Sequence, residues 1–508
     1  MESFRGLDAA LIGAGHNGLA CAALLARQGL SVAVFESGER IGGAAVSEPA
    51  WDGYTVSTAS YVCTLLDPWL IETLGLERHG YSAYRKDPAT FNVLADGRSL
   101  LLGSDDAQND REIAAFDPRD AAAFRALDAH IRDLGSALFD TFSDEQPRFD
   151  RLAPEIRRDL IGSAAEIAER YVRTPVLGAA IATDGIIGTY LGPRDAGTGY
   201  VLAHHYAGRA LGVQGAWGYV RGGMGSISKA LAAAAMEHGA RIVTQQRVAR
   251  ILVEDGKAAG IVLEDGAQVR ARVVASNAHP RTTFLDLAGS EHLTEDFVRR
   301  VRDWNTTGAA MKINFAIGEL PDFTCRPGTA PAPHHRATIH VAPSIDYIQD
   351  ACDTARATGS SDRPMLECFL QTPTDSSLAP EGKHILSVFA QYYPYDRKDG
   401  WSSQTREAAA DRVMDILGEF APDLPGAVEA RQILTPVDLE SRFGLTGGHI
   451  FHGELLPGQI YEDRFATRTP LPNLYLCGSG AHPGGCVSGF PGKRAAGAIL
   501  ADLQVQAR

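Results

Sequence analysis

The hydrophobic pattern near the start of the chain predicts a strand, a tight turn, a helix and a second strand over residues 9–36. The short apolar run "AALIGAG" is typical of a buried strand, and the apolar helix that follows extends to about Arg27. Gly29 ends that helix, and "SVAVFE" is a second buried strand. This order of elements is typical of an α/β fold.

Two later stretches carry a helical period. Residues 106–214 are predicted to be mainly helical, and "PEIRRDLIGSAAEIAERYV" within them places its apolar side chains on one helical face. The segment "GGMGSISKALAAAAMEHG", residues 222–239, predicts a helix that ends at a glycine. We therefore expect a helical insertion between strand-containing parts of the chain.

Between and after these helices the pattern changes to a period of two. Residues 241–277 alternate, with Asp-Gly pairs at 255–256 and 265–266 that are typical of hairpin turns. The segment "AAMKINFAI" at 309–317 predicts a further strand, and "LPDFTCRPGTAPAPHH" predicts a long loop. The chain closes with a glycine-rich strand and helix, "LYLCGSGAHPGGCVSGFPGKRAAG".

The first glycine motif, Gly13-x-Gly15-x-x-Gly18, opens the first helix, and the next strand ends in Glu36, eighteen residues after Gly18. This context matches a dinucleotide-binding fingerprint. Gly13 makes the tight turn, Gly15 lets the backbone approach a pyrophosphate, and Gly18 lets helix and strand pack closely. The carboxylate of Glu36 suits two ribose hydroxyls and repels a 2′-phosphate, so FAD or NAD is predicted rather than NADP.

A second glycine pair, Gly42-Gly43 in "ERIGGAA", lies just beyond the second strand. A nicotinamide-binding domain does not need this additional point of close approach. The pair therefore favours FAD over NAD.

Composition and charge exclude some function classes. The 508 residues favour two domains, and 45% hydrophobic with 22% charged residues is ordinary for a globular protein. The formal charge of −14 argues against nucleic-acid binding and, weakly, against docking on anionic membranes. No apolar run is long enough to span a bilayer, and "MESFRGLD" lacks the apolar region of a secretory signal. We expect a cytoplasmic location, with contact at a membrane surface left open.

Cysteine and histidine spacing gives no sign of a metal or a redox-active dithiol. The seven cysteines are scattered, odd in number and without a C-x-x-C pair, which argues against a disulfide framework. His449 and His452 form an H-x-x-H pattern without an evident third ligand, so we expect no metal site.

The chain resembles the superfamily of FAD-dependent amine oxidases and phytoene desaturases, and more narrowly its phytoene-desaturase-like branch. The matching segments, in order, are "GAGHNGL", "VFESGERIGGAAVSE", "YVRGGMGSISKALAAAAMEHGARI", "PVDLESRFGLTGGHIFHGELLPGQIY" and "NLYLCGSGAHPGGCVSG". The resemblance implies a Rossmann-like FAD-binding domain of the GR2 type, in discontinuous segments, and an α+β substrate-binding domain. We expect the FAD-binding domain at 1–105, 215–300 and 465–508, a helical insertion at 106–214, and the substrate-binding domain at 301–464.

In this family both glycine loops hold one FAD, the N-terminal loop at the pyrophosphate and the C-terminal loop at the ribityl chain and isoalloxazine. The resemblance implies cofactor contacts at Gly13, Gly15, His16, Asn17, Gly18, Glu36, Arg40, Gly42, Gly43, Ala44, Val248, Gly478, Ser479, Gly480, His482, Pro483, Gly484, Cys486 and Val487. Two of these positions depart from the family pattern. Ala44 stands where many relatives have Arg, and Cys486 replaces a glycine.

The resemblance also names three candidates for chemistry. Lys312 matches the strand where amine oxidases often have a lysine linked to flavin N5 through water; the alternative is an edge or ion-paired lysine. His449 and His452 lie near the flavin by resemblance, with structural histidines as the alternative. The doublets at 204–205 and 334–335 are read as surface or packing residues, and Trp217 and Tyr219 either line a substrate channel or pack.

The function that these features favour is an FAD-dependent oxidoreductase. It would take a hydride from an apolar or amphipathic organic substrate, forming a C=C bond as a desaturase or dehydrogenase. Two alternatives remain: an amine or amino-acid oxidase that reduces O₂, and a non-redox FAD-dependent isomerase or hydratase. The expected partners are a small-molecule organic substrate and O₂, a quinone or another electron acceptor, and a homodimer stays open.

Overall fold

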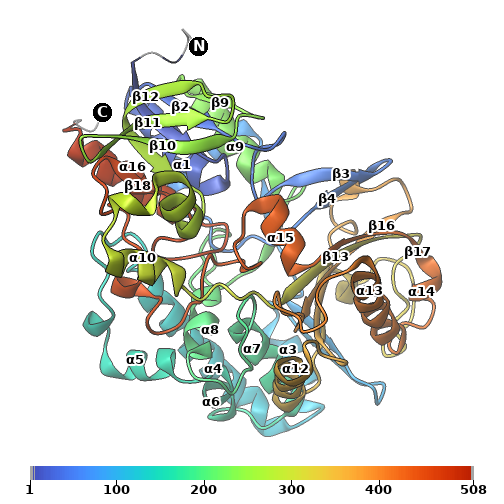
Figure 1. Cartoon of the computed structure of the whole chain (residues 1–508). Coiled ribbons are helices and arrows are strands. Elements are labelled where there is room, and N and C mark those ends of the chain that lie inside the picture. Colours follow the sequence, from blue (N-terminus) through green and yellow to red (C-terminus); the bar gives the residue numbers. More distant parts are fainter. Residues whose placement is uncertain (1–3, 5, 505–508) are drawn as a thin grey trace.

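The unit predicted at residues 9–36 lies in the middle of a seven-stranded sheet in the computed structural model (Figure 1). It comprises β1 (Leu7–Ile12), α1 (His16–Arg27) and β2 (Val32–Phe35). β1 pairs in parallel with β2 on one side and with β12 (Gln268–Ser276) on the other. The structure describes residue 4 and residues 6–504, so the predicted N-terminal segment "MESFRGLD" and the outer ends of segments 1–105 and 465–508 lie partly outside the described residues.

Distant parts of the chain complete this first sheet. β9 (Arg241–Val243) pairs in parallel with β2, and β18 (Leu474–Leu476) pairs in parallel with β12. The long strand β12 also continues into an antiparallel meander with β11 (Lys257–Leu263) and β10 (Val248–Glu254), whose turns contain the two predicted Asp-Gly pairs. The strand near the C-terminus therefore lies two positions from the strand near the N-terminus.

Three helices cover one face of the first sheet. α1 packs between α9 (Gly225–Glu237) and α16 (Phe490–Asp502), and their alanine-rich faces join one buried apolar cluster with the sheet. The packing of α16 on α1 is close, because a Cβ on Gly492 would lie 2.1 Å from the carbonyl oxygen of Asn17. This contact brings the two ends of the chain together.

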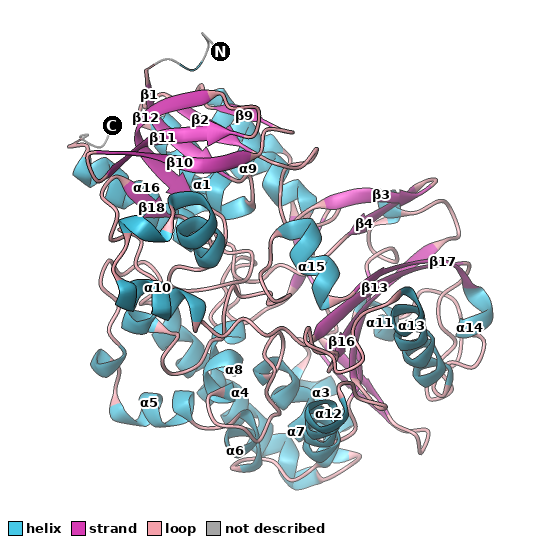
Figure 2. Cartoon of the chain, in the orientation of Figure 1, coloured by secondary structure: helices cyan, strands magenta, loops and turns pink. Residues whose placement is uncertain are grey.

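A second seven-stranded sheet is built mainly from the predicted strand at 309–317 and the chain after it (Figure 2). β13 is an interior strand, antiparallel to β16 and β17, and every one of its residues is buried. In spatial order the strands are β17 (Val428–Leu434), β13 (Ala310–Ile317), β16 (His384–Gln391), β15 (Met365–Leu370), β14 (Thr338–Val341), β6 (Thr90–Val93) and β7 (Ser99–Leu102).

The expected domain boundary at residue 105 does not follow the sheets. β6 pairs with β14, so residues 90–102 belong to the second sheet although they precede the expected boundary. One face of this sheet is covered by α13 (Ser403–Gly418), whose apolar side chains share a buried cluster with the strands. Two short helices also contact this part of the fold: α11 (Pro333–Arg336) contacts β14 and β15, and α14 (Leu424–Ala427) contacts α13.

Residues 106–214 contain helices and no strand in the described chain. They are α3 (Asp106–Ala114), α4 (Pro118–Phe139), α5 (Pro154–Ile161), α6 (Ala164–Glu169), α7 (Pro175–Ala182) and α8 (Thr198–Tyr206). The single helix expected across 154–172 is wrong. Gly162 takes extended backbone and Ser163 starts α6 with a capping box, which leaves Ile161 46% exposed.

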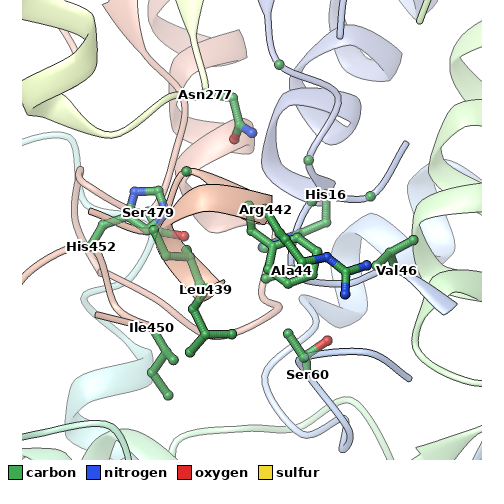
Figure 3. Close-up of a pocket in the computed structure, with 18 of the residues that line it drawn as sticks. His16, Ala44, Val46, Ser60, Asn277, Leu439, Arg442, Ile450, His452 and Ser479 are labelled. Carbon is green, nitrogen blue, oxygen red and sulfur yellow. The ribbon is translucent and has the colours of Figure 1, made fainter. Parts of the chain in front are cut away.

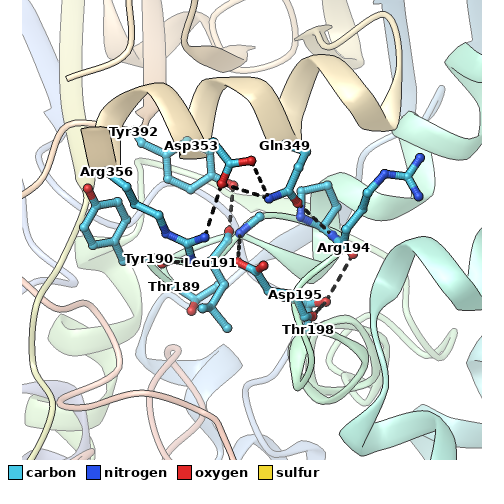
Figure 4. Close-up of polar contacts among 12 residues, drawn as sticks. Thr189, Tyr190, Leu191, Arg194, Asp195, Thr198, Gln349, Asp353, Arg356 and Tyr392 are labelled. Carbon is cyan, nitrogen blue, oxygen red and sulfur yellow. Dashed lines mark hydrogen bonds and ion pairs between the residues drawn. The ribbon is translucent and has the colours of Figure 1, made fainter. Parts of the chain in front are cut away.

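Polar contacts join the helical segment to the second sheet through α12 (Ile345–Thr358) (Figure 4). The Arg356 guanidinium donates to Asp195 Oδ2 (2.6 Å), and Arg194 donates to Asp346 Oδ1 (2.7 Å). The hydroxyl of Tyr392 donates to the carbonyl oxygen of Leu191 (2.7 Å). These bonds cross between segments far apart in sequence and hold the helices against the sheet.

Smaller elements connect these layers. Two two-stranded ribbons are formed by β3 (Ser47–Trp51) with β4 (Tyr54–Ser57), and by β5 (Ala83–Arg85) with β8 (Gly218–Val220). The remaining α-helices are α2 (Pro68–Thr73), α10 (Glu295–Arg302) and α15 (Pro436–Phe443). In the described part of the chain, no helix combines the length and apolar character needed to cross a membrane.

The close approach of α16 to α1 predicts opposite effects for two glycines of one helix. Gly492→Ala should lower the free energy of unfolding by about 2–3 kcal/mol, because the added methyl meets the Asn17 backbone. Gly497→Ala should raise it by about 0.5–1 kcal/mol, because Gly497 is exposed, helical and has no atom within 4 Å of an added Cβ. Urea denaturation of both variants measures the difference, and equal effects would contradict the packing described.

Candidate functional site

A cavity of about 660 Å³ lies where the first sheet meets the second. Gly13 follows β1, Glu36 follows β2, Asn277 follows β12 and Ser479 follows β18, and all four line the cavity. The opposite wall comes from the second sheet and includes Lys312 of β13. Ligands of parallel α/β sheets bind outside the carboxyl ends of the strands, which is where this cavity opens.

The two N-terminal glycine segments are bonded directly to each other. The Gly42 amide donates to the carbonyl oxygen of Ala14 (2.8 Å), and Gly15 forms an isolated parallel bridge with Gly42. A Cβ on Gly18 would lie 2.4 Å from the carbonyl oxygen of Gly13, so α1 approaches the turn only because Gly18 lacks a side chain. Gly18 therefore shapes the loop and does not itself line the cavity.

Glu36 lies at the cavity with its carboxylate already oriented. Its Oε2 accepts from the Ala14 amide (2.8 Å) and its Oε1 accepts from the Gly38 amide (2.8 Å). These bonds use part of the acceptor capacity of the carboxylate and leave lone pairs for hydroxyls of a ligand. The other predicted N-terminal and middle contacts that line the cavity are Gly13, Gly15, His16, Asn17, Arg40, Gly42, Gly43, Ala44 and Val248.

The C-terminal loop divides into residues that line the cavity and residues that pack behind it. Ser479, Cys486 and Val487 line it. A Cβ on Gly478 would lie 2.5 Å from the Asn277 carbonyl oxygen, so this glycine allows close packing of backbone. The cavity lining does not include Gly478, Gly480, His482, Pro483 or Gly484, so their direct contact with the cofactor stays a prediction.

One side-chain hydrogen bond connects the two glycine loops: Asn17 Nδ2 donates to Ser479 Oγ (3.1 Å) across 462 residues of sequence. Arg464 fixes the C-terminal loop from behind. Its buried guanidinium donates to the carbonyl oxygens of Ser479 (2.8 Å) and Phe451 (2.5 Å), and burial lowers its pKa to about 10. Sequence reasoning missed Arg464, because no local motif surrounds it.

Asn277 was also missed, although its position after a predicted strand was the available signal. It lies against the first glycine motif, since a Cβ on Gly15 would be 2.5 Å from Asn277 Nδ2. Figure 3 shows it with His16, Ser479 and His452 around the same space, each from a different segment.

The cavity walls carry buried polar atoms that no described protein group bonds, including His16 Nε2, Asn17 Oδ1, Ser60 Oγ, His279 Nε2 and His452 Nδ1. Buried polar groups in folded proteins are nearly always hydrogen-bonded. Polar atoms of this kind on residues that line a cavity are expected to find their partners in a polar ligand. Bare glycine backbone, the Glu36 carboxylate and these atoms together fit an adenine dinucleotide.

Lys312 is neither an edge lysine nor ion-paired with a described carboxylate. It lies in interior strand β13, 2% exposed, where Nζ donates to Asn314 Oδ1 (2.6 Å) and to Ser387 Oγ. The ammonium is 5.3 Å from the centroid of the Tyr61 ring. Burial lowers the pKa of Lys312 to about 7, so its proton is easily exchanged near neutral pH.

The structure separates the two histidines of the H-x-x-H pattern. His452 lines the cavity, and burial, reinforced by Arg464, lowers its pKa to about 3, so the ring is neutral. His449 is not part of the cavity lining, and its expected position near the flavin stays a prediction. It is fully buried, with Nε2 3.4 Å from Glu454 Oε2.

Several other expectations change with the structure. The histidine doublets at 204–205 and 334–335 are buried, so the surface reading is wrong. His205 lines the cavity, as does Trp217, whereas Tyr219 is not among the lining residues.

Cys486 has a backbone conformation that glycine adopts more readily than other residues. Its φ of 72° lies in the left-handed region, which costs a non-glycine residue roughly 1–2 kcal/mol. Burial raises the pKa of its thiol to about 12, so it is a poor nucleophile. The cysteines are free, and the described residues contain no cluster of three or more His, Cys, Asp or Glu suited to a metal ion.

Comparisons with known proteins agree with the geometry. The family model for flavin-containing amine oxidoreductases matches residues 18–317. The chain is 39% identical to pyridine nucleotide-disulfide oxidoreductase domain-containing protein 2 of Rattus norvegicus, over 98% of this chain and 94% of that protein. It is 28% identical to hydroxyneurosporene desaturase of Cereibacter sphaeroides, over 98% of each chain.

Solved structures extend the comparison to the fold. Cyclohexylamine oxidase from Brevibacterium oxydans IH-35A superposes with a TM-score of 0.63 at 19% identity, over 98% of this chain and 99% of that one. The expected mixed α/β fold is confirmed by this likeness.

Removing the charge of Glu36 should weaken FAD binding. Glu36→Gln is expected to raise the Kd of FAD about 10- to 100-fold, because a charged acceptor for ribose hydroxyls is lost. Fluorescence titration of the deflavinated protein with FAD measures it. Glu264→Gln, at an exposed carboxylate that does not line the cavity, is the control. Unchanged affinity in Glu36→Gln would show that the carboxylate does not hold the ribose.

Proposed function

Because this chain belongs to the family of flavin-containing amine oxidoreductases and is an FAD-dependent oxidoreductase, we propose that it oxidises an apolar or amphipathic organic substrate as a dehydrogenase or desaturase, forming a C=C bond. The observation that supports this best is a single cavity that joins bare glycine backbone to an apolar wall with one buried lysine. This proposal concerns the class of bond that is oxidised. The substrate of the protein is a small organic molecule.

The proposed domain division follows the sheets. The FAD-binding domain, Rossmann-like in type, comprises the first sheet with α1, α9 and α16. The substrate-binding domain comprises the second sheet, including β6 and β7, together with the helical segment. The substrate lies where β13 faces the glycine loops.

The residues that would hold FAD are those of the glycine segments, with Glu36 at a ribose and Ser479, Cys486 and Val487 at the flavin end. Bound FAD supplies acceptance of a hydride. The protein excludes water and orients a C–H bond, since Ile187, Ala310 and Phe389 form a buried apolar cluster against which Tyr61, Trp217 and Ile450 pack, and all of these line the cavity. Lys312 holds or releases a proton at Nζ beside this wall.

Hydroxyneurosporene desaturase, by its name, introduces unsaturation, which favours C=C formation for this chain also. Oxidation of an amine is the second candidate, because Lys312 is buried at the cavity without a described carboxylate partner, and a neutral lysine there tolerates an uncharged amine. The electron acceptor in either case is O₂, a quinone or another acceptor.

Anaerobic mixing with candidate substrates tests the proposed function. Polyenes and cyclic alkenes should bleach the flavin absorption and yield a product with an added C=C bond. Bleaching by amines, with peroxide formed in air, would instead favour the second candidate. Fully flavinated protein that no member of a panel of polyenes, amines, amino acids and hydroxylated cyclic compounds reduces would oppose both.

Lys312→Met should slow flavin reduction and change how stability depends on pH. We expect a rate constant about 100-fold lower if Nζ takes part in proton transfer. Burial lowers the pKa of Lys312 from 10.5 to about 7, so between these values the unfolded chain binds the additional proton and wild-type stability rises with pH. The variant lacks this rise, which urea denaturation from pH 6.5 to 10 measures.

The control is Lys257→Met, at an exposed lysine of β11. It should retain both the rate and the wild-type dependence on pH. A Lys312→Met protein with the wild-type rate would leave the lysine with a structural role alone.

A further inference from the structure

His205 is a polar ring in the apolar part of the cavity that the proposed function does not use. It comes from α8, is 2% exposed and lines the cavity. Its ring is stacked on the indole of Trp217, with centroids 5.5 Å apart and an interplanar angle of 29°. Phe451 lies on another side, 5.9 Å between centroids. The ring is therefore held in one orientation by packing.

Backbone carbonyls fix the tautomer of His205. Nδ1 lies 2.8 Å from the carbonyl oxygen of Asp184 and 3.0 Å from that of Val201. Carbonyl oxygens only accept hydrogen bonds, so Nδ1 carries the proton and donates it. Burial lowers the pKa of His205 below its ordinary value, which favours the neutral ring. Its other nitrogen, Nε2, then has a lone pair and no proton.

No described protein group donates to this lone pair. Lys86 lies near the stacked pair, with its Nζ 5.7 Å from the Trp217 ring centroid, and it donates to Thr338 Oγ1. Unlike both nitrogens of neighbouring His204, Nε2 of His205 is not among the fully enclosed unbonded atoms. His205 lines the cavity and its Nδ1 is bonded to backbone carbonyls, so Nε2 is the ring nitrogen left for a ligand there.

We propose that His205 Nε2 is the hydrogen-bond acceptor that selects the substrate, and that the substrate is an apolar molecule carrying one hydroxyl or amino group. This inference rests on the proposed function, because it assumes that the substrate occupies the wall formed by Ile187, Phe389 and Trp217. A hydrocarbon without a donor leaves the acceptor unbonded after displacing water from it. A donor-bearing analogue satisfies it, and so binds more tightly.

Discrimination between donor and parent compounds can be measured without turnover. The probes are matched pairs: perillyl alcohol with limonene, and cyclohexylamine with methylcyclohexane. Each is titrated into the anaerobic holoenzyme, and the Kd is taken from the perturbed flavin spectrum. The hydroxyl or amine member of at least one pair should bind about 10- to 100-fold more tightly than its parent. Which pair shows the preference distinguishes hydroxyl from amine.

Two variants then assign the preference to His205. His205→Phe keeps an aromatic ring on Trp217 but no acceptor, so the donor and parent compounds should bind equally. His205→Gln, which has an amide oxygen as acceptor and an amide N–H as donor, should restore part of the preference. His292→Gln, at an exposed histidine far from the cavity lining, should match the wild type in every pair. Saturating rates of flavin reduction should change less than Kd.

Long-range ¹⁵N NMR of histidine-labelled holoenzyme tests the tautomer in the wild type, and so does not depend on the folding of a variant. It should find His205 unprotonated at Nε2, and the bound alcohol or amine should shift that nitrogen. The proposal is overturned if no donor-bearing probe binds more tightly than its parent, absence of binding included, or if His205→Phe keeps the preference. If the holoenzyme binds these probes with the expected preference but its flavin is never reduced, the result opposes the proposed function and not the role of His205.

Discussion

The hydrogen bond between Asn17 and Ser479 marks the constraint on which the rest of the structure depends, namely that both ends of the chain meet at one edge of one sheet. Parallel pairing of β18 with β12, beside β1, places the two glycine loops at neighbouring strand ends. The close packing of α16 on α1 at Gly492 keeps them there. A shift of either element separates the loops, and a dinucleotide held by both would lose one of its two attachments.

Because the C-terminal strand β18 completes the first sheet, the residues between the two ends that do not join this sheet form a separate layer. The intervening residues build the second sheet and the helical segment, and interior strand β13 turns one row of side chains toward the glycine loops. Lys312 lies in that row, where burial of an ammonium is unfavourable. The strand tolerates it because Asn314 and Ser387 accept its hydrogen bonds and because its pKa falls.

Local features were predictable from sequence, and contacts between distant segments were not. The turn at Gly13, the Asp-Gly hairpins and the acidic residue after β2 each depend on a few neighbouring residues, so the local sequence predicts them. Arg464 and His205 carry no such pattern, because each bonds a backbone carbonyl of another segment, Ser479 for Arg464 and Asp184 for His205. The break at Gly162 was missed because a helical period continued across it.

The unbonded polar atoms on residues that line the cavity show that the polypeptide alone does not satisfy the hydrogen-bonding capacity of all its buried polar groups. His16, Asn17, Ser60 and His279 contribute such atoms from separate segments. A ligand that bonds them binds the folded chain and not the unfolded one, so it stabilises the fold by mass action. At the other end, the wall near Trp217 is mainly apolar, and His205 contributes an acceptor there. Polar groups at one end therefore favour tight retention of a cofactor, while the apolar end suits a substrate that must enter and leave.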